Sequence, residues 1–328
     1  RFTHAFFRQT LYEEMIAPQR LKMHQQVARA LESQYAKRLE EHAAELAEHF
    51  SQSTDPADLT KAVSYGEMAA KRAIDVFAYG EAVRLLEQAL KVQRVLDPDD
   101  KAKQCDLLLA LGNALAIAGE PKRAVDIEIP EAFAMAEAIG DAARASMACT
   151  LAIVGMVYLA GNALFGTPEF ARWAERADRY AEPDTISRVW ADFATGEIRI
   201  RTYQVTHQLG IIDEGRRLTN KALGLARRLG DQDAFWFIAY YFVFVHDPNT
   251  TEARWRLAEE LAGRSRSGVA VRTLGIALLS IGVVFLESGQ RERADAMGRE
   301  LKELAERTRQ AHVILLAMEW ESFEAVMD

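Results

Sequence analysis

Three side chains on one helical stretch are of types that bind metal ions. His42, Glu45 and His49 follow one another at three and four residues, a spacing that puts them near one face of a helix. A structural zinc site takes four ligands, and no cluster of Cys or His lies nearby in the sequence. The run Glu40-Glu41-His42 is also typical of a solvated helix face. We therefore predict no metal site, no cofactor and no catalytic residue in this chain.

The densest apolar run is Phe235–Val245, which carries Trp236, Tyr240 and Tyr241. A helix that is apolar on all sides is usually buried between its neighbours. Aromatic side chains with polar tips also line binding surfaces. These three residues are therefore either core residues or part of a groove that holds a ligand or a second copy of the chain.

Arginines gather between residues 199 and 228. They can hold an acidic peptide or a phosphate, but arginines on helix surfaces commonly pair with neighbouring carboxylates. The six are Arg199, Arg201, Arg216, Arg217, Arg227 and Arg228.

The composition limits the classes of partner. The 328 residues carry a net charge of −8, which argues against a basic face for nucleic acid. Two cysteines form no disulfide framework and suit a reducing compartment. The apolar runs Ala234–Val245 and Leu274–Leu286 are too short to cross a bilayer. We expect a cytoplasmic protein that binds neither nucleic acid nor membrane.

Small residues recur along the chain, each near the start of an expected helix. Their spacings are 42, 47, 44, 38 and 41 residues, for Ala82, Ala124, Ala171, Gly215, Ala253 and Ala294. A period of this size indicates stacked supersecondary units that cannot bury their faces alone. The sequence thus predicts consecutive helical hairpins.

The hairpins can be placed by their apolar periodicity and turn residues. The first is predicted over Ala57–Ala78 and Gly80–Leu96, and the second over Ala102–Ala118 and Pro121–Ile139. Asp55 and Pro56 read as an N-cap and first helical residue. Pro130 lies inside the last of these helices and predicts a kink or break near Ile129. No strand pattern is present, so the expected fold class is all-α.

Two hairpins align position for position. Leu108, Leu111-Gly112, Leu115, Gly119 and Ala124 match Leu278, Ile281-Gly282, Phe285, Gly289 and Ala294. The glycine inside the first helix permits a close crossing, and the small residue opening the second fits against it.

This pattern resembles tetratricopeptide-like repeats, which implies a right-handed α-solenoid. By that resemblance Asn113 corresponds to a peptide-gripping position and joins the groove candidates Trp236, Tyr240 and Tyr241. The chain departs from the family in its longer period and in Glu128, where a bulky apolar residue is usual. A one-residue insertion is expected before Ala132.

The N-terminus carries a second, more specific pattern. Its residues are Phe2-x-His4, Tyr12, Arg20, His24, Ala28 and Leu31, followed by Ala47-Glu48-His49-Phe50. This resembles the junction between the nucleotide-binding module and the repeat region of bacterial signalling ATPases of the AAA/STAND type. Such proteins often carry a class III nucleotidyl cyclase, a helix-turn-helix output domain or a kinase domain.

The second resemblance implies a boundary and an interface. Residues 1–54 would form the helical junction and residues 55–328 the solenoid. His4, Tyr12, Arg20 and His24 are either half-exposed helix residues or contacts to an upstream domain. The chain begins at Arg1 rather than Met, and we expect a segment of a longer polypeptide.

Three hypotheses about function follow. The first is a regulatory or scaffold module that binds a protein, a peptide or a small effector. The second is a self-association module that makes the parent protein a homodimer. The third, an enzyme in its own right, has the least support, because the chain contains no G-x-x-x-x-G-K-[ST] phosphate loop.

Overall fold

A computed structural model describes the chain except for residues 1–11, 13, 209, 245–250 and 328. The described residues form helices and turns and no strand, which confirms the all-α prediction. The chain divides into two compact units, residues 1–161 and 162–328. The boundary expected at residue 54 lies inside the first unit, where α3 (Ala43–Ser51) and α4 (Pro56–Asp75) pack against each other.

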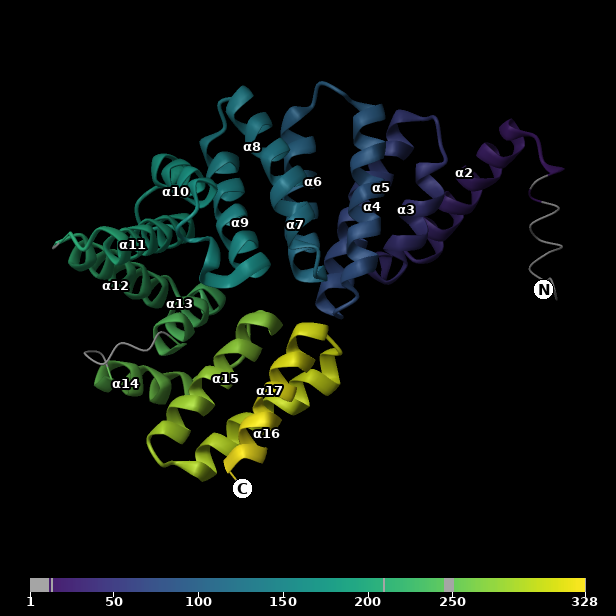
Figure 1. Cartoon of the computed structure of the whole chain (residues 1–328). Coiled ribbons are helices and arrows are strands. Elements are labelled where there is room, and N and C mark those ends of the chain that lie inside the picture. The colour runs from purple at the N-terminus through teal and green to yellow at the C-terminus, as the bar shows by residue number, and fades with distance from the viewer. Residues whose placement is uncertain (1–11, 13, 209, 245–250, 328) are drawn as a thin grey trace. The chain divides into compact units, whose positions relative to one another are not determined.

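Unit 1 is a succession of antiparallel helices joined by short turns (Figure 1). Each helix packs mainly on the helices that precede and follow it. Besides α3 and α4 the elements are α2 (Ala17–Gln34), the 3-10 turn η1 (Leu39–His42), α5 (Tyr79–Leu96), α6 (Lys101–Ala118), α7 (Pro121–Arg123), the π-helical turn η2 (Ala124–Glu128), α8 (Ile129–Ala138) and α9 (Ala142–Ala160).

Unit 2 follows the same plan. Its elements are α10 (Pro168–Tyr180), α11 (Ile186–Thr206), α12 (Ile211–Leu229), α13 (Gln232–Phe244), α14 (Thr251–Ala262), α15 (Val271–Glu287), α16 (Arg291–Thr308) and α17 (Ala311–Met327), with the 3-10 turn η3 (Gly161–Leu164) at the unit boundary. The apolar periodicity of the sequence also predicts a first helix over Thr3–Met15, and nearly all of that range lies outside the described residues.

Several helices begin and end at the capping residues that the sequence predicted. The Asp55 carboxylate accepts a hydrogen bond of 2.9 Å from the Ala57 N–H, and Pro56 opens α4. Gly119 ends α6 in the left-handed conformation, with φ at 95°. A side-chain acceptor supplies a partner to an N–H that the helix leaves open, and glycine adopts positive φ without strain.

The break predicted near Ile129 is present as a π-helical turn. The chain runs through η2 from Ala124 to Glu128, and α8 begins at Ile129 with Pro130 in its first turn. A π turn holds one residue more than an α turn. It therefore accommodates the insertion expected before Ala132, and Ala124, Ile129 and Ala132 all remain fully buried.

Helices cross closely where small residues meet. At Gly66 an added Cβ would lie 3.1 Å from Ala89 Cβ, where α4 crosses α5. Gly196 and Gly215 face each other at the α11–α12 crossing, and a Cβ on either would come within 3 Å of the other's carbonyl oxygen. Because that contact involves backbone, a side-chain movement cannot relieve it.

Most of the recurring small residues occupy such positions. Ala82, Ala124 and Ala294 are fully buried, Gly215 is buried, and Ala171 is half-buried. Ala253 is the exception, because it is exposed. In α14 the inward positions belong instead to Arg254, Ala258 and Leu261, so the choice of Ala253 as the inward-facing residue of that helix was wrong.

Trp320 of α17 fills a space created by two glycines. Its indole is fully buried. A Cβ at Gly282 of α15 would lie 2.6 Å from the Trp320 ring, and one at Gly298 of α16 would lie 1.9 Å from Trp320 Nε1. The Trp320 N–H donates to the Glu324 carboxylate at 2.8 Å. Gly282 therefore admits a residue from α17 and not, as the sequence suggested, the start of α16.

Ion pairs join successive hairpins inside each unit. Lys103 on α6 contacts Glu67 on α4 at 2.7 Å, 36 residues away, and Arg144 on α9 contacts Asp106 on α6 at 2.8 Å, 38 residues away. Arg227 on α12 and Glu260 on α14 are 33 residues apart and pair at 2.6 Å. Links at nearly one repeat length are typical of units that contact only their neighbours.

Among the helices that the structure describes, one has the length and composition of a membrane span. It is α9, Ala142–Ala160, with a mean hydropathy of 1.6; neither of the two apolar runs chosen from the sequence meets the same test. The helix packs on α6 and α8 and buries Ala145, Cys149 and Ile153 fully. Core helices of globular units share this composition, so its burial in unit 1 accounts for its apolar character.

Candidate functional site

The structure brings together most of the N-terminal residues singled out from the sequence. The Tyr12 hydroxyl lies 2.9 Å from His24 Nε2, and the Arg20 guanidinium lies over the Tyr12 ring at 5.5 Å. His24 Nδ1 lies 2.8 Å from His49 Nδ1. Burial and the nearby His49 lower the pKa of His24. His4 lies outside the described residues.

The three residues considered for a metal take separate roles. His42 stacks on Tyr35 with ring centroids 3.5 Å apart and lies 3.7 Å from the Glu45 carboxylate, whereas His49 faces His24. Across the described ranges, no group of three or more His, Cys, Asp or Glu side chains is placed to hold a metal ion.

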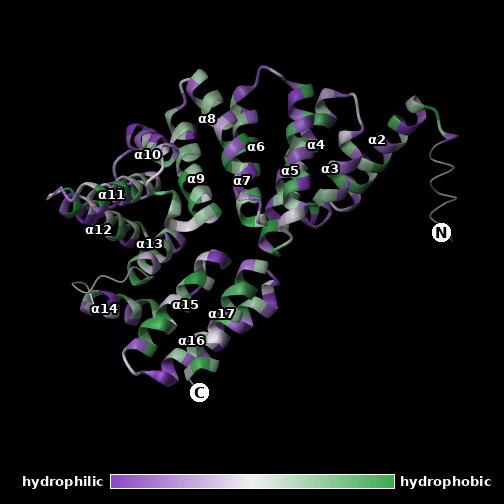
Figure 2. Cartoon of the chain, in the orientation of Figure 1, coloured by the Kyte–Doolittle hydropathy of each residue, from purple (hydrophilic) through white to green (hydrophobic). Residues whose placement is uncertain are grey.

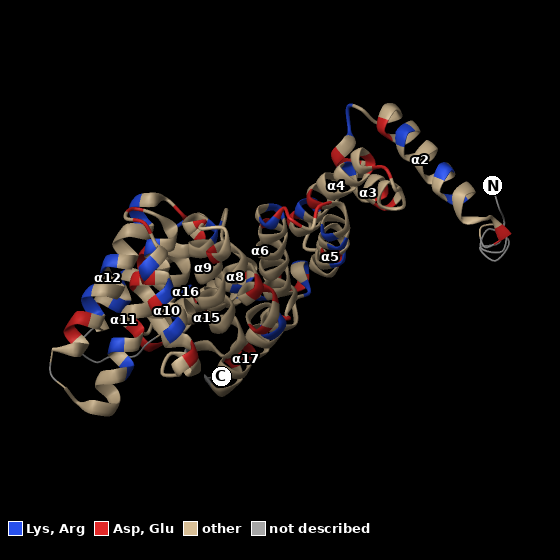
Figure 3. Ribbon diagram, turned by 90° about the horizontal axis from the view of Figure 1, so that it is seen from above, with Lys and Arg blue, Asp and Glu red and all other residues tan. Residues whose placement is uncertain are grey.

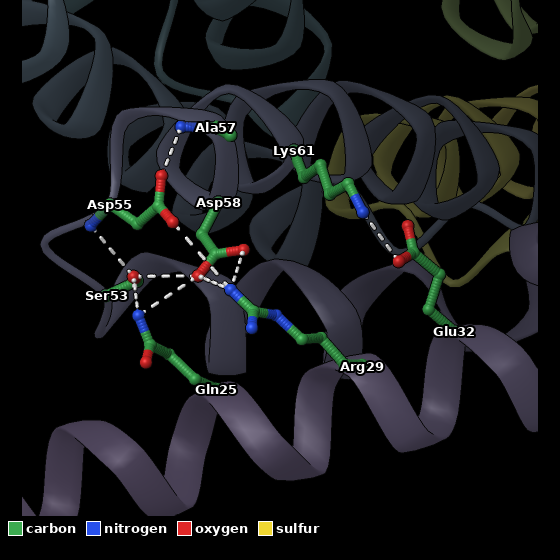
Figure 4. Close-up of polar contacts among 8 residues, drawn as sticks. All are labelled: Gln25, Arg29, Glu32, Ser53, Asp55, Ala57, Asp58 and Lys61. Atoms are coloured by element: carbon green, nitrogen blue, oxygen red, sulfur yellow. Dashed lines mark hydrogen bonds and ion pairs between the residues drawn. The ribbon is translucent and has the colours of Figure 1, made fainter.

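A polar network fastens α2 to α4 (Figure 4). The buried Asp58 carboxylate accepts hydrogen bonds from Ser53 at 2.9 Å and from Gln25 and Arg29 at 3.2 Å. One turn further along α2, Glu32 pairs with Lys61 at 2.6 Å. The only fully buried residue of α2 is Ala28, so hydrogen bonds rather than apolar burial hold much of this helix in place.

Replacing Asp58 with asparagine should release α2 from the rest of unit 1. Asparagine has a single acceptor oxygen, so its NH2 group would face at least one of the donors on Arg29, Gln25 and Ser53, and the negative charge beside Arg29 would be lost. Losing hydrogen bonds to a buried charge costs about 1–3 kcal/mol. We expect faster hydrogen exchange of the α2 amides. Asp100→Asn, at the N-cap of α6, is the matched control, because asparagine caps a helix as well as aspartate does. Unchanged exchange in D58N would contradict the role given to the network.

The aromatic groove candidates lie in the core of unit 2. Trp236 is 0% exposed, and Tyr240 and Tyr241 are also buried. The rings of Trp190, Phe193 and Phe237 meet edge to face, and Phe193 meets Tyr241 in the same way. Helix α13 is apolar on all sides because α11, α12, α14 and α15 surround it. Core packing, not a groove, is therefore the role of these residues in this structure.

This aromatic core contains a buried carboxyl group. Glu197 of α11 is 2% exposed and accepts a hydrogen bond of 2.6 Å from the Tyr241 hydroxyl. Burial raises the pKa of Glu197 to about 7, although the Tyr241 hydrogen bond and the Arg201 charge act in the opposite direction. Burial and the neighbouring Glu197 also raise the pKa of Tyr241. Glu197 thus changes protonation near neutral pH.

The arginine-rich segment pairs largely within the chain. Arg199 contacts Glu214 at 3.0 Å, Arg227 contacts Glu260 at 2.6 Å, and Arg228 lies 3.7 Å from Asp184. Figure 3 shows the Lys and Arg of α11 and α12 interleaved with Asp and Glu. These arginines therefore fit surface pairing with neighbouring carboxylates better than the binding of an acidic peptide or a phosphate.

An open groove of about 420 Å³ lies in unit 1 between α5 and the η2–α8 segment. The buried Leu108 and Leu111 of α6 form its floor, together with Leu90 of α5. Val95 and Ile127 lie on its rim and are 73% and 57% exposed. A concave surface with an apolar floor is the usual form of a binding site.

Ion pairs cross this groove. Arg123 Nη2 lies 2.8 Å from Glu87 on α5, and Arg94 on α5 lies 2.6 Å from Glu131 on α8. The Arg123 guanidinium also contacts Glu128 Oε1, at 2.9 Å from Nε. Arg123 and Glu128 are five residues apart, and the π turn places such residues on the same side of the helix.

Glu128 is the unusual member of the groove. It is 4% exposed, and its second oxygen, Oε2, is buried without a hydrogen-bond donor among the described residues. A buried acceptor without a donor costs free energy. The sequence marked Glu128 as irregular but did not place it in a groove; Asn113, the residue assigned to one, is exposed and does not line this surface.

No protein-family model matches the sequence, and a search of curated proteins returns no match.

Proposed function

We propose that the chain is a non-catalytic binding module built from tetratricopeptide-like hairpins, and that its function is regulatory or scaffolding. The observation that carries the proposal is the groove between α5 and α8, with its apolar floor and the donorless Glu128 oxygen. The hairpin-to-hairpin ion pairs and the glycine crossings support a solenoid order within each unit, and the right-handed sense is what the resemblance to tetratricopeptide-like repeats implies.

A peptide library tests the binding function. Heptapeptides displayed on phage would be selected on the whole chain and then compared on Leu111→Asp, which places a charge on the groove floor. We expect to select peptides that bind the original chain and whose affinity for L111D is at least tenfold lower. Ile281→Asp alters the aligned position of the other well-matched hairpin and is the control for general damage. A selection that yields no groove-dependent peptide contradicts the binding function.

We further propose that the parent is a cytoplasmic bacterial signalling ATPase of the AAA/STAND type, linked to a nucleotidyl cyclase or a transcriptional output. The N-terminal pattern supports this, and Tyr12, Arg20 and His24 form one cluster that an upstream domain would contact. The complete gene sequence is the test. An open reading frame without an upstream phosphate loop would contradict the family assignment.

Self-association is the second candidate, because α17 exposes an apolar face. Leu315, Met318 and Val326 are 64%, 56% and 86% exposed, and Figure 2 colours much of this helix hydrophobic. The exposed Arg307 and Arg309 precede α17, and exposed glutamates occupy its second half. Two copies of α17 in antiparallel contact would pair these opposite charges, as a two-fold interface requires.

Leu315→Glu tests this interface. A glutamate in the middle of the apolar face would put two unpaired charges into the contact, one from each copy. The dissociation constant of the dimer should therefore rise at least tenfold. Light scattering after size exclusion would measure the mass over a range of concentrations. Val205→Glu, at an exposed apolar residue of α11, is the control. A monomer at every concentration of the unmodified chain would eliminate this candidate.

A further inference from the structure

The groove in unit 1 has an acceptor that its own side chains leave unused. Arg123 divides its guanidinium between Glu87 and Glu128 and contacts only Oε1 of Glu128. Oε2 has no donor within the part of unit 1 that the structure describes, although Glu128 lines the groove. A ligand that brings an N–H donor, and above all a charged one, would satisfy this oxygen.

The rest of the groove suits an aliphatic side chain. Leu90, Leu108 and Leu111 offer an apolar floor beside Glu128, and Val95 and Ile127 extend the apolar surface toward the rim. The volume of about 420 Å³ is that of a small ligand site. It has room for one aliphatic side chain together with the end of a long basic one.

Arg123 can make way for such a ligand without losing all its partners. Its side chain is 35% exposed and already pairs with Glu87 on the opposite wall at 2.8 Å. If Arg123 turns fully to Glu87, the Glu128 carboxylate becomes open to a basic group from the ligand. With Arg123 on Glu87 and Arg94 on Glu131, Glu128 is the carboxylate of the lining that has no arginine partner. Lys91 also lines the groove, but its side chain is exposed, so the local charge at Glu128 is −1, which a single cation complements.

We propose that this groove binds an extended peptide segment carrying an aliphatic and a basic side chain two residues apart, with the basic group on Glu128 and the aliphatic one on Leu108 and Leu111. The spacing follows because alternate side chains of an extended chain point to the same side. This inference rests on the binding function proposed above and specifies its ligand.

Three labelled peptides test the proposal directly. The probe is fluorescein-Gly-Ser-Leu-Ser-Arg-Ser-amide, compared with versions in which Arg is replaced by Gln or Glu. Fluorescence anisotropy with the whole chain would measure the three dissociation constants. We expect the Arg peptide to bind at least tenfold more tightly than the other two, and its affinity to fall with added salt. Equal binding of the Arg and Gln peptides overturns the proposal.

Variants separate the two halves of the site. Glu128→Gln keeps the size of the side chain, and it should weaken the Arg peptide about tenfold and remove the difference between Arg and Gln. Glu259→Gln is the matched control, because Glu259 pairs with Arg293 in the corresponding hairpin of unit 2. Arg-peptide binding by E128Q equal to that of the original chain overturns the assignment of the basic group.

A further variant keeps the proposal testable if E128Q does not fold. Ile127 is 57% exposed, so Ile127→Ser can be made without opening the core, and it should weaken all three peptides by a similar factor. An unchanged affinity of I127S contradicts the position of the aliphatic group. Groove-dependent library peptides that lack a basic residue would leave the binding function standing and refute this ligand, whereas no groove-dependent peptide at all would refute both.

Discussion

Gly298→Ala is expected to destabilise unit 2 by about 2–4 kcal/mol, because the new Cβ would lie 1.9 Å from Trp320 Nε1 and the indole would have to leave its site. The better helix propensity of alanine returns only about 1 kcal/mol. All five tryptophans lie between residues 173 and 320, so intrinsic fluorescence during urea unfolding reports on unit 2 alone.

Two comparisons isolate the contact between Gly298 and Trp320. Gly224→Ala changes another helical glycine, whose Cβ would meet only the Arg228 guanidinium at 3.9 Å, and it should be neutral or stabilising. Introduced into Trp320→Ala, the G298A change should lose most of its cost, because the indole is absent. Additive effects of the two substitutions would mean that the clash is not the cause.

Glu197→Gln should remove a pH dependence of about 3 kcal/mol from the stability of unit 2. The folded carboxyl has a pKa of about 7, against an ordinary value of 4.5 for the unfolded chain. The folded state therefore binds the proton more tightly. This contribution to the free energy of unfolding is complete below pH 4.5 and is lost as the pH rises to about 7.

Urea unfolding followed by tryptophan fluorescence at several pH values would measure this effect. The difference in unfolding free energy, E197Q minus the original chain, should increase by about 3 kcal/mol between pH 4.5 and pH 7.5. Glu214→Gln is the control, because it removes a half-exposed carboxylate that pairs with Arg199. The difference in unfolding free energy between E214Q and the original chain should change little over the same pH range. A flat difference for E197Q would show that Glu197 stays ionised in the folded chain.

Features set by local sequence were predictable. Helix ends at Asp55-Pro56 and Gly119 depend on residues within one turn, and the structure has them where the sequence placed them. The irregularity near Ile129 followed from Pro130 and the position of Ala132, because a proline and an altered repeat both disturb the helical register. The sequence did not show that a π turn would be the result.

Features that depend on a third helix were not predictable. Gly282 on α15 indicated a close crossing, but its partner Trp320 comes from α17, the second helix further along the chain and 38 residues later. The aromatic run left core and surface alternatives open, since periodicity is uninformative when every side of a helix is apolar. The groove escaped notice because Glu87 and Arg123 are 36 residues apart, and their pairing needs both helices in place.

The π turn in unit 1 shows how a repeat can change length without changing its core. In a regular helix one additional residue would rotate everything after it by about 100°. Here Ala132, Phe133 and Ala136 stay buried beyond the turn, so the rotation is absorbed within five residues. A residue added at this turn therefore moves no core side chain beyond it, and the surface next to the turn can differ between repeats while the packing inside stays the same.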